Sequence, residues 1–260
     1  MQDQENRYLR MTPLLNGDSP EISALVRERG WRGLSEHDRI GAAYDFVRNE
    51  IRFGYNFDDA IPATRVLADG YGQCNTKATL LMAILRALGI PCRLHGFTIR
   101  KSLQRGIVPE LVYPIAPENI VHTWVEVRLD GRWIDLEGFI VDDDVLKALQ
   151  RRFAARSDSL CAYGVGTDCL SAPGVEWAGK ETYIQKTGIN QDFGLYDDPD
   201  TFYLTHGQDL GWFRGLLFRY IIRRWMNRRV EAMRGGDIPH IPARPKNEGS
   251  RHMTRLEEAK

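Results

Sequence analysis

A glycine-rich approach that ends in a cysteine leads directly into a strongly helical stretch of this chain. From Cys74 onward apolar residues recur at helical spacing, and Gly89 followed by Pro91 provides a stop. The spacing predicts one amphipathic helix that begins at Cys74. The unpaired N–H groups and the positive dipole end of a helix stabilise an anion, so this position favours a thiolate.

A cysteine at a helix start has two interpretations. It can be a small hydrophobe in the core, or it can be a nucleophile when a base lies within reach. Because a nucleophile needs that base, the rest of the chain decides between the two interpretations of Cys74.

A hairpin further along the chain offers the base. Val121–Leu129 alternates between polar and apolar residues, with His122 and Trp124 on one face, as a half-buried strand does. Asp130-Gly131 is a hairpin turn signal, and residues 132–139 are expected to form the return strand. The chain should therefore present His122 on one arm of an antiparallel hairpin.

Two carboxylates lie on the expected return strand, where side chains two residues apart point the same way. Asp135 and Glu137 therefore share a face, and either could reach His122. A thiol, an imidazole and a carboxylate suffice for nucleophilic acyl chemistry, because histidine takes the thiol proton and the acid holds the imidazole in the productive tautomer.

In combination these motifs resemble the core of the transglutaminase-like superfamily over roughly residues 36–140. The runs that carry the resemblance are Gly72-Gln73-Cys74, Leu85 to Arg93, His122 to Val127 and Gly131-Arg132-Trp133. The resemblance implies an α+β protein with a papain-like arrangement. In that arrangement the cysteine-bearing helix packs on an antiparallel sheet that carries the histidine and the acid.

The resemblance implies a role for each matching residue. Cys74 matches the family nucleophile and His122 the family base. The family acid is usually an aspartate four residues after the tryptophan of the return strand, and that position here is Glu137. Asp135 lies two residues earlier, so we favour Glu137 and keep Asp135 as the alternative.

The oxyanion and cleft groups are less well specified. The backbone N–H of Cys74 is expected to be one oxyanion donor, and Gln73 or Tyr71 could supply the second. Trp124 is expected to be a core or cleft-wall aromatic. No cofactor is required for this chemistry, and the cysteine and acidic spacings do not indicate a metal site.

The 260 residues are expected to form one domain with extensions rather than two complete domains. The expected parts are a helical N-terminal extension (1–34), the catalytic core (35–140), an accessory segment packed on the core (141–210), a basic amphipathic helix (211–236) and a disordered tail (237–260). Residues 188–200 are rich in turn residues and could either fold over the cleft or form a surface loop.

The helix at residues 212–234 alternates apolar residues with arginines. Such a helix can lie on an anionic membrane or an acidic partner, but we expect it to pack on the core with a solvated arginine face. Lys plus Arg and Asp plus Glu each number 35, so the charge balance does not point to nucleic acid. The polar N-terminus and the lack of a long apolar run favour the cytoplasm.

These observations predict a thiol-dependent acyl-transfer enzyme that acts on an amide, ester or thioester carbonyl. Its substrate would be a peptide, a protein or a small acyl compound. Two alternatives remain. One is a cysteine amidase or peptidase with the same three groups, and the other is a non-catalytic binding protein that keeps the fold.

Overall fold

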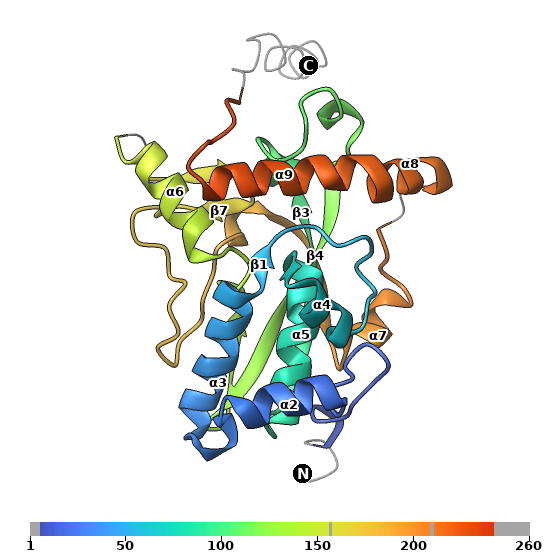
Figure 1. Cartoon of the computed structure of the whole chain (residues 1–260), viewed down its shortest axis with the longest axis vertical. Coiled ribbons are helices and arrows are strands. Elements are labelled where there is room, and N and C mark those ends of the chain that lie inside the picture. The colour runs from blue at the N-terminus through green and yellow to red at the C-terminus, as the bar shows by residue number, and fades with distance from the viewer. Residues whose placement is uncertain (1–5, 156–157, 209–210, 242–260) are drawn as a thin grey trace, which may run out of the picture.

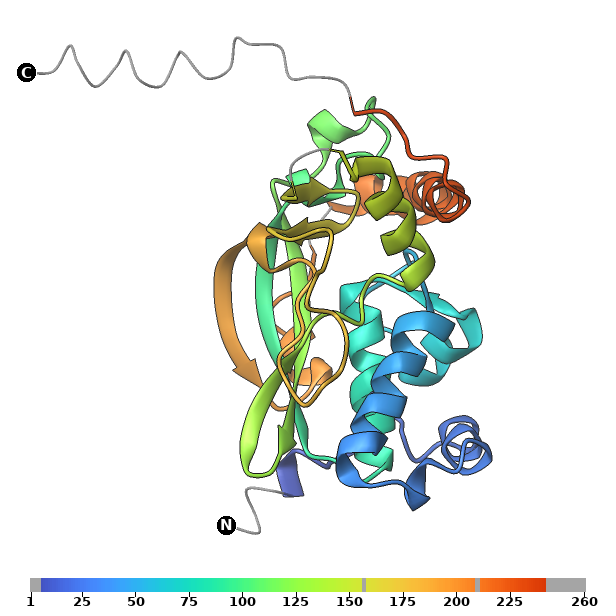
Figure 2. The same cartoon turned by 90° about the vertical axis from the view of Figure 1, so that its left-hand side faces the viewer.

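The computed structural model describes residues 6–155, 158–208 and 211–241. Most of the tail that was expected to be disordered, from residue 242 onward, lies outside the described residues, as do the first five residues of the N-terminal extension. The described chain forms a helical layer against a twisted antiparallel sheet, as Figure 2 shows from the side. The predicted α+β architecture is confirmed.

The sheet has four antiparallel strands in the order β5-β4-β3-β8. Their bounds are β3 (Cys92–Arg100), β4 (Asn119–Leu129), β5 (Arg132–Leu136) and β8 (Ile189–Tyr196). The turn between β4 and β5 has positive φ at Asp130 (49°) and Gly131 (77°), as expected for an Asp-Gly hairpin. This hairpin gives the sheet the two arms that the sequence predicted.

The helix α5 (Cys74–Ala87) begins at the cysteine, as predicted, but it is not amphipathic in its surroundings. Every residue from Cys74 to Arg86 is buried, because sheet and helices enclose α5 on all sides. Several of its polar side chains donate to backbone carbonyls: Lys77 Nζ donates to those of Arg48 and Ile140 at 3.1 and 3.0 Å. The helix is thus the centre of the fold.

Short capped helices surround α5. Ser19 accepts from the backbone N–H of Ile22 at the start of α2, and Ser35 accepts from that of Asp38 at the start of α3. The remaining elements before the C-terminal helix are α2 (Pro20–Glu28), α3 (Glu36–Asp45), η2 (Phe46–Glu50), β1 (Arg52–Phe53), α4 (Ala63–Asp69), β2 (Tyr71–Gly72), α6 (Asp143–Phe153), β6 (Leu160–Ala162), β7 (Val165–Thr167) and α7 (Pro199–Tyr203), with short 3-10 turns at Trp31–Gly33, Lys101–Gln104, Tyr113–Ile115 and Lys186–Gly188.

The turn-rich segment around residues 188–200 is mostly a strand, not the loop that its composition suggested. Within it β8 pairs antiparallel with β3 and forms an edge of the sheet. The register shifts twice along this pair, and Gly194 has a φ of 83°. Such bulges break the two-residue period by which a strand is detected. The sheet therefore extends beyond residues 35–140.

The C-terminal helix is confirmed, with a π-helical turn in its middle. It consists of α8 (Gly211–Leu217), η6 (Phe218–Ile222) and α9 (Arg223–Arg234) and lies across one end of the molecule (Figure 1). Its arginines are not all solvated as expected, because Arg223, Arg229 and Arg234 donate hydrogen bonds to the protein. Within the described residues we find no helix that combines the length and the apolar character needed to cross a bilayer.

Candidate active site

Tight packing of the backbone positions Cys74 at the start of α5. A Cβ atom at Gly72 would lie 2.7 Å from Thr76 Oγ1 and 2.9 Å from Lys77 Cγ, so the approach to the cysteine needs glycine here. The backbone N–H of Gln73 donates to Thr76 Oγ1 at 3.1 Å. These contacts fix the first turn of the helix, whose initial N–H groups have no partner within the helix.

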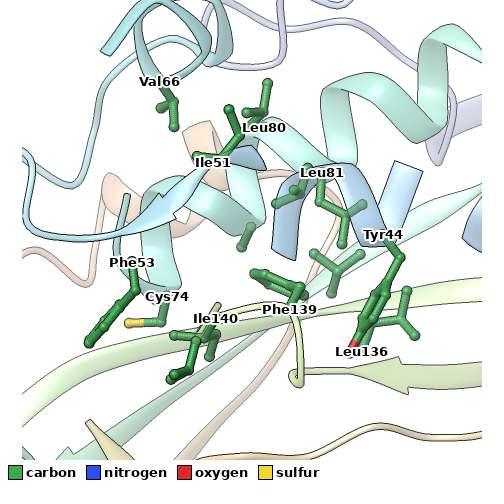
Figure 3. Close-up of a cluster of buried hydrophobic side chains, with 14 of the residues drawn as sticks. Tyr44, Ile51, Phe53, Val66, Cys74, Leu80, Leu81, Leu136, Phe139 and Ile140 are labelled. Atoms are coloured by element: carbon green, nitrogen blue, oxygen red, sulfur yellow. The ribbon is translucent and has the colours of Figure 1, made fainter. Parts of the chain in front are cut away.

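The side chain of Cys74 lies at the wall of a cavity. The side chain is 8% exposed, and Figure 3 shows it beside Phe53 and Ile140. Cys74 Sγ is 3.5 Å from Asn75 Oδ1. Cys74 also lines a cavity of about 700 Å³, which makes the thiol accessible to a molecule inside it.

His122 and Glu137 form a buried ion pair near the cysteine. His122 Nε2 lies 2.8 Å from Glu137 Oε1, and both side chains are fully buried. His122 Nδ1 is also buried but has no hydrogen bond of ordinary geometry within the described residues. Because Nε2 is occupied by the carboxylate, Nδ1 is the nitrogen left to exchange a proton.

Three interactions control the charge of His122. Burial opposes the charged imidazolium, but the negative charges of Cys74 and Glu137 outweigh it and raise the pKa of His122 to about 10. The environment therefore favours an imidazolium beside the sulfur.

The two candidate carboxylates occupy different surroundings. Strand β5 ends at Leu136, earlier than the expected return strand, because the next backbone N–H groups turn to Thr182. Glu137 follows the strand end and bonds His122. Asp135 instead accepts from the Tyr183 hydroxyl at 2.6 Å. The structure thus brings Glu137, and not Asp135, to the histidine.

Of the residues expected in the cleft, Gln73 lines the cavity and Trp124 does not. Gln73 lines the cavity, but its amide is occupied, since it accepts from the N–H of Asn56 and donates to Asp59 Oδ1, both at 2.8 Å. The Tyr71 hydroxyl accepts from Arg223 at 3.1 Å. Trp124 belongs to an aromatic cluster on the sheet, where its ring centroid lies 4.1 Å from that of Phe97, and it does not line this cavity.

Three further groups near the site escaped the sequence interpretation. The backbone N–H groups of Ile184 and Gln185 both donate to Glu137 Oε2 at 2.9 Å. Tyr203 lines the cavity, and its buried hydroxyl lies near Thr123 without a hydrogen bond of ordinary geometry in the described part of the chain. Burial raises the pKa of Tyr203, so the hydroxyl keeps its proton. No local sequence signal marks any of these groups.

Two further histidines have different surroundings. His95 lies between Glu126 and Asp192, 2.9 and 3.0 Å from their carboxylate oxygens. His37 is exposed. A search of the described residues finds no group of three or more His, Cys, Asp or Glu side chains that could hold a metal ion.

Comparison with known proteins finds a family model that matches part of the chain. Residues 29–138 match the model of the transglutaminase-like superfamily. A solved structure from Cytophaga hutchinsonii, described as a "putative cysteine protease", is 14% identical with a TM-score of 0.44; the match covers 76% of this chain and 48% of that one. The chain thus spans about half the length of that structure. No curated protein matches. Residues 29–138 are thus similar to the transglutaminase-like superfamily, in agreement with the resemblance that the motifs of this segment indicate.

Proposed function

We propose that this chain is a thiol enzyme in which Cys74, His122 and Glu137 transfer an acyl group from an amide, ester or thioester. The observation that supports this proposal best is the buried 2.8 Å pair of His122 and Glu137 beside a cysteine at a helix start. Burying a histidine and a carboxylate costs folding free energy, so a pair of this kind beside a cysteine that lines a cavity is a candidate for function.

The reaction proceeds in two steps. The Cys74 thiolate attacks the carbonyl carbon and forms a C–S bond, and the leaving group departs with the proton of His122 Nδ1. Water or an amine then gives a proton to the same nitrogen and attacks the thioester, which breaks the C–S bond and restores the thiolate. Glu137 holds the imidazole through Nε2 during both transfers.

Two donors are proposed for the oxyanion. The first is the backbone N–H of Cys74, which has no partner within the helix. The second is the Tyr203 hydroxyl, since it lines the same cavity and keeps its proton. It replaces Gln73 and Tyr71 in this role, because the Gln73 amide already donates to Asp59 and Tyr71 does not line this cavity.

Limited alkylation tests the proposed nucleophile. Cys161 and Cys169 are exposed, so they should react first if all four thiols were ordinary, whereas Cys92 is buried and burial raises its pKa. Brief treatment with limiting iodoacetamide at about pH 6, followed by peptide mapping, should instead label Cys74 first. The preference should disappear in His122→Ala.

Two further results distinguish the alternatives. Labelling of Cys74 no faster than Cys161 would contradict the enzyme proposal and favour a binding protein with this fold. If acyl substrates are turned over and Cys74→Ala abolishes turnover, the products formed in the presence of excess amine identify the acceptor of the acyl group. Hydrolysed product alone would assign an amidase or peptidase, and amine adducts would assign a transferase.

A further inference from the structure

The cavity at Cys74 has an extended apolar lining drawn from three parts of the chain. The sheet and the segment before α4 contribute Ile99, Ile120 and Phe53, and the excursion between β3 and β4 contributes Leu103, Val108 and Val112. The C-terminal helix covers the cavity from the other side with Leu217, Ile222 and Met226. At about 700 Å³ the cavity lies in the size range that small ligands occupy.

The polar lining includes amides of Asn and Gln side chains and two carboxylates, Asp58 and Asp59, of which Asp59 accepts from Gln73 Nε2 at 2.8 Å. Asn56 and Gln73 are hydrogen-bonded to one another, and Asn75 follows the cysteine directly. Among the described lining residues, the positively charged side chain is Arg219. It forms an ion pair with Asp58, with Nη2 3.1 Å from Oδ2. This part of the wall thus offers a phosphate or carboxylate no unpaired cation, and it favours a neutral ligand.

The apolar lining continues to the protein surface. Trp212, Leu216 and Ile115 line the cavity and are 80%, 47% and 51% exposed. Exposed apolar groups that continue into an apolar interior fit a ligand whose own surface is apolar. A chain entering between them would bury surface on both sides.

From these observations we infer that the acyl group accepted by Cys74 is a neutral aliphatic chain of medium length, which extends from the thiol along the cavity. The inference rests on the proposed function and adds the substrate class to it. The carbonyl carbon stays at the sulfur, the chain fills the space between the excursion and the C-terminal helix, and the leaving group lies outside the cavity.

A series of p-nitrophenyl esters from acetate to decanoate, each below its micelle concentration, tests the inference. Turnover that depends on Cys74 is obtained by subtracting the rate of Cys74→Ala. Each methylene that enters the cavity should multiply kcat/KM by about fourfold, equivalent to about 0.8 kcal/mol, until the cavity is full. The octanoyl ester should therefore exceed the acetyl ester at least tenfold.

Two variants reduce the cavity from opposite walls. Val112→Trp enlarges a half-buried side chain in the excursion between β3 and β4. Gly215→Leu adds a side chain to the C-terminal helix, at a position where a Cβ would meet no atom within 4 Å. Both should lower kcat/KM for the octanoyl ester at least tenfold while changing the acetyl ester less than twofold. Leu111→Trp is the matched control, because Leu111 is 88% exposed and lies outside this cavity.

The outcomes separate this inference from the proposed function. Cys74-dependent turnover that is independent of chain length would overturn the inference and leave the proposed function standing. Turnover of apolar peptide amides that Val112→Trp impairs, without a chain-length effect, would assign the cavity to a peptide side chain instead.

If no ester is turned over, the proposed function fails. Binding of esters to the cavity then tests whether it accepts an aliphatic chain. Calorimetric titration of Cys74→Ala with methyl octanoate and methyl acetate measures that binding without turnover. Binding of methyl octanoate at least tenfold tighter, and lost in Val112→Trp, supports an aliphatic site. Equal binding of the two esters overturns it.

Discussion

His122 Nε2 and Glu137 Oε1 lie 2.8 Å apart in a fully buried pair, and backbone donors saturate the other carboxylate oxygen. Ile184 and Gln185 supply those donors from a segment outside the predicted core. The carboxylate therefore cannot rotate without losing two hydrogen bonds. This arrangement holds the imidazole in one orientation, with Nδ1 left for chemistry.

Replacing Glu137 should impair catalysis far more than replacing Asp135. Glu137→Gln keeps the shape but removes the charge that holds the imidazolium, so kcat/KM should fall on the order of 100-fold to 10,000-fold. The pKa of His122 should also fall, which moves the alkaline limb of the rate profile to lower pH. Steady-state kinetics across pH measures both effects.

Asp135→Asn is the matched control for that experiment. Its carboxylate bonds the Tyr183 hydroxyl, so kcat/KM should change by less than about threefold, as for groups remote from the chemistry. A large loss in Asp135→Asn together with a small loss in Glu137→Gln would assign the orienting role to Asp135.

The charge of His122 should make stability fall as pH rises. Its pKa is raised from 6.5 to about 10 in the folded protein, so its contribution is complete below pH 6.5 and is lost as pH rises through 10. His122→Gln leaves Glu137 without its charged partner and should cost about 3–5 kcal/mol at pH 6. Urea unfolding of both proteins should show this deficit shrinking toward pH 10, and a constant deficit would contradict the raised pKa.

Lys77 should show the opposite dependence. Burial lowers the pKa of Lys77 from 10.5 to about 7, so the folded protein releases a proton that the unfolded chain keeps between these values. Its stabilising contribution therefore grows as pH rises from 7 toward 10.5.

Lys77→Met tests this dependence by removing the donor to the carbonyls of Arg48 and Ile140. The variant should be about 1–3 kcal/mol less stable at pH 9.5, since it leaves two buried acceptors unpaired. The deficit should be smaller at pH 6.5. A larger deficit at the lower pH in urea unfolding would contradict a neutral Lys77.

Local signals were enough to predict the helix at Cys74 and the hairpin. The helix is marked by the spacing of its apolar residues and by the stop at Gly89. Asp130-Gly131 likewise dictates a hairpin from its own φ angles. The proposed catalytic groups were identifiable because Cys74 and His122 lie on such local elements.

Groups whose partners are distant in sequence were not predictable in this way. Lys77 lies on a helix that periodicity marks as amphipathic, yet its acceptors come from other segments. The amides of Ile184 and Gln185 lie 47 and 48 residues after Glu137 and carry no side-chain signal. The strand β8 was missed because its bulges hide the period of the pattern.

The C-terminal helix should depend on Asn227 for its position over the cavity. Asn227 Oδ1 accepts from the backbone N–H of Tyr55 at 2.7 Å, and its Nδ2 donates to the Tyr55 carbonyl at 3.1 Å. Tyr55 lines the cavity, so this pair of bonds joins the helix to the wall near Cys74.

Asn227→Ala leaves both backbone groups of Tyr55 without these partners and should cost about 1–3 kcal/mol in urea unfolding. A displaced helix would also widen the cavity, so KM should rise several-fold more than kcat changes. Arg228→Ala is the control, because this neighbouring side chain is exposed and should change stability by less than about 0.5 kcal/mol. Equal stability of the two variants would mean that the apolar contacts of Met226, Val230 and Met233 hold the helix without help from Asn227.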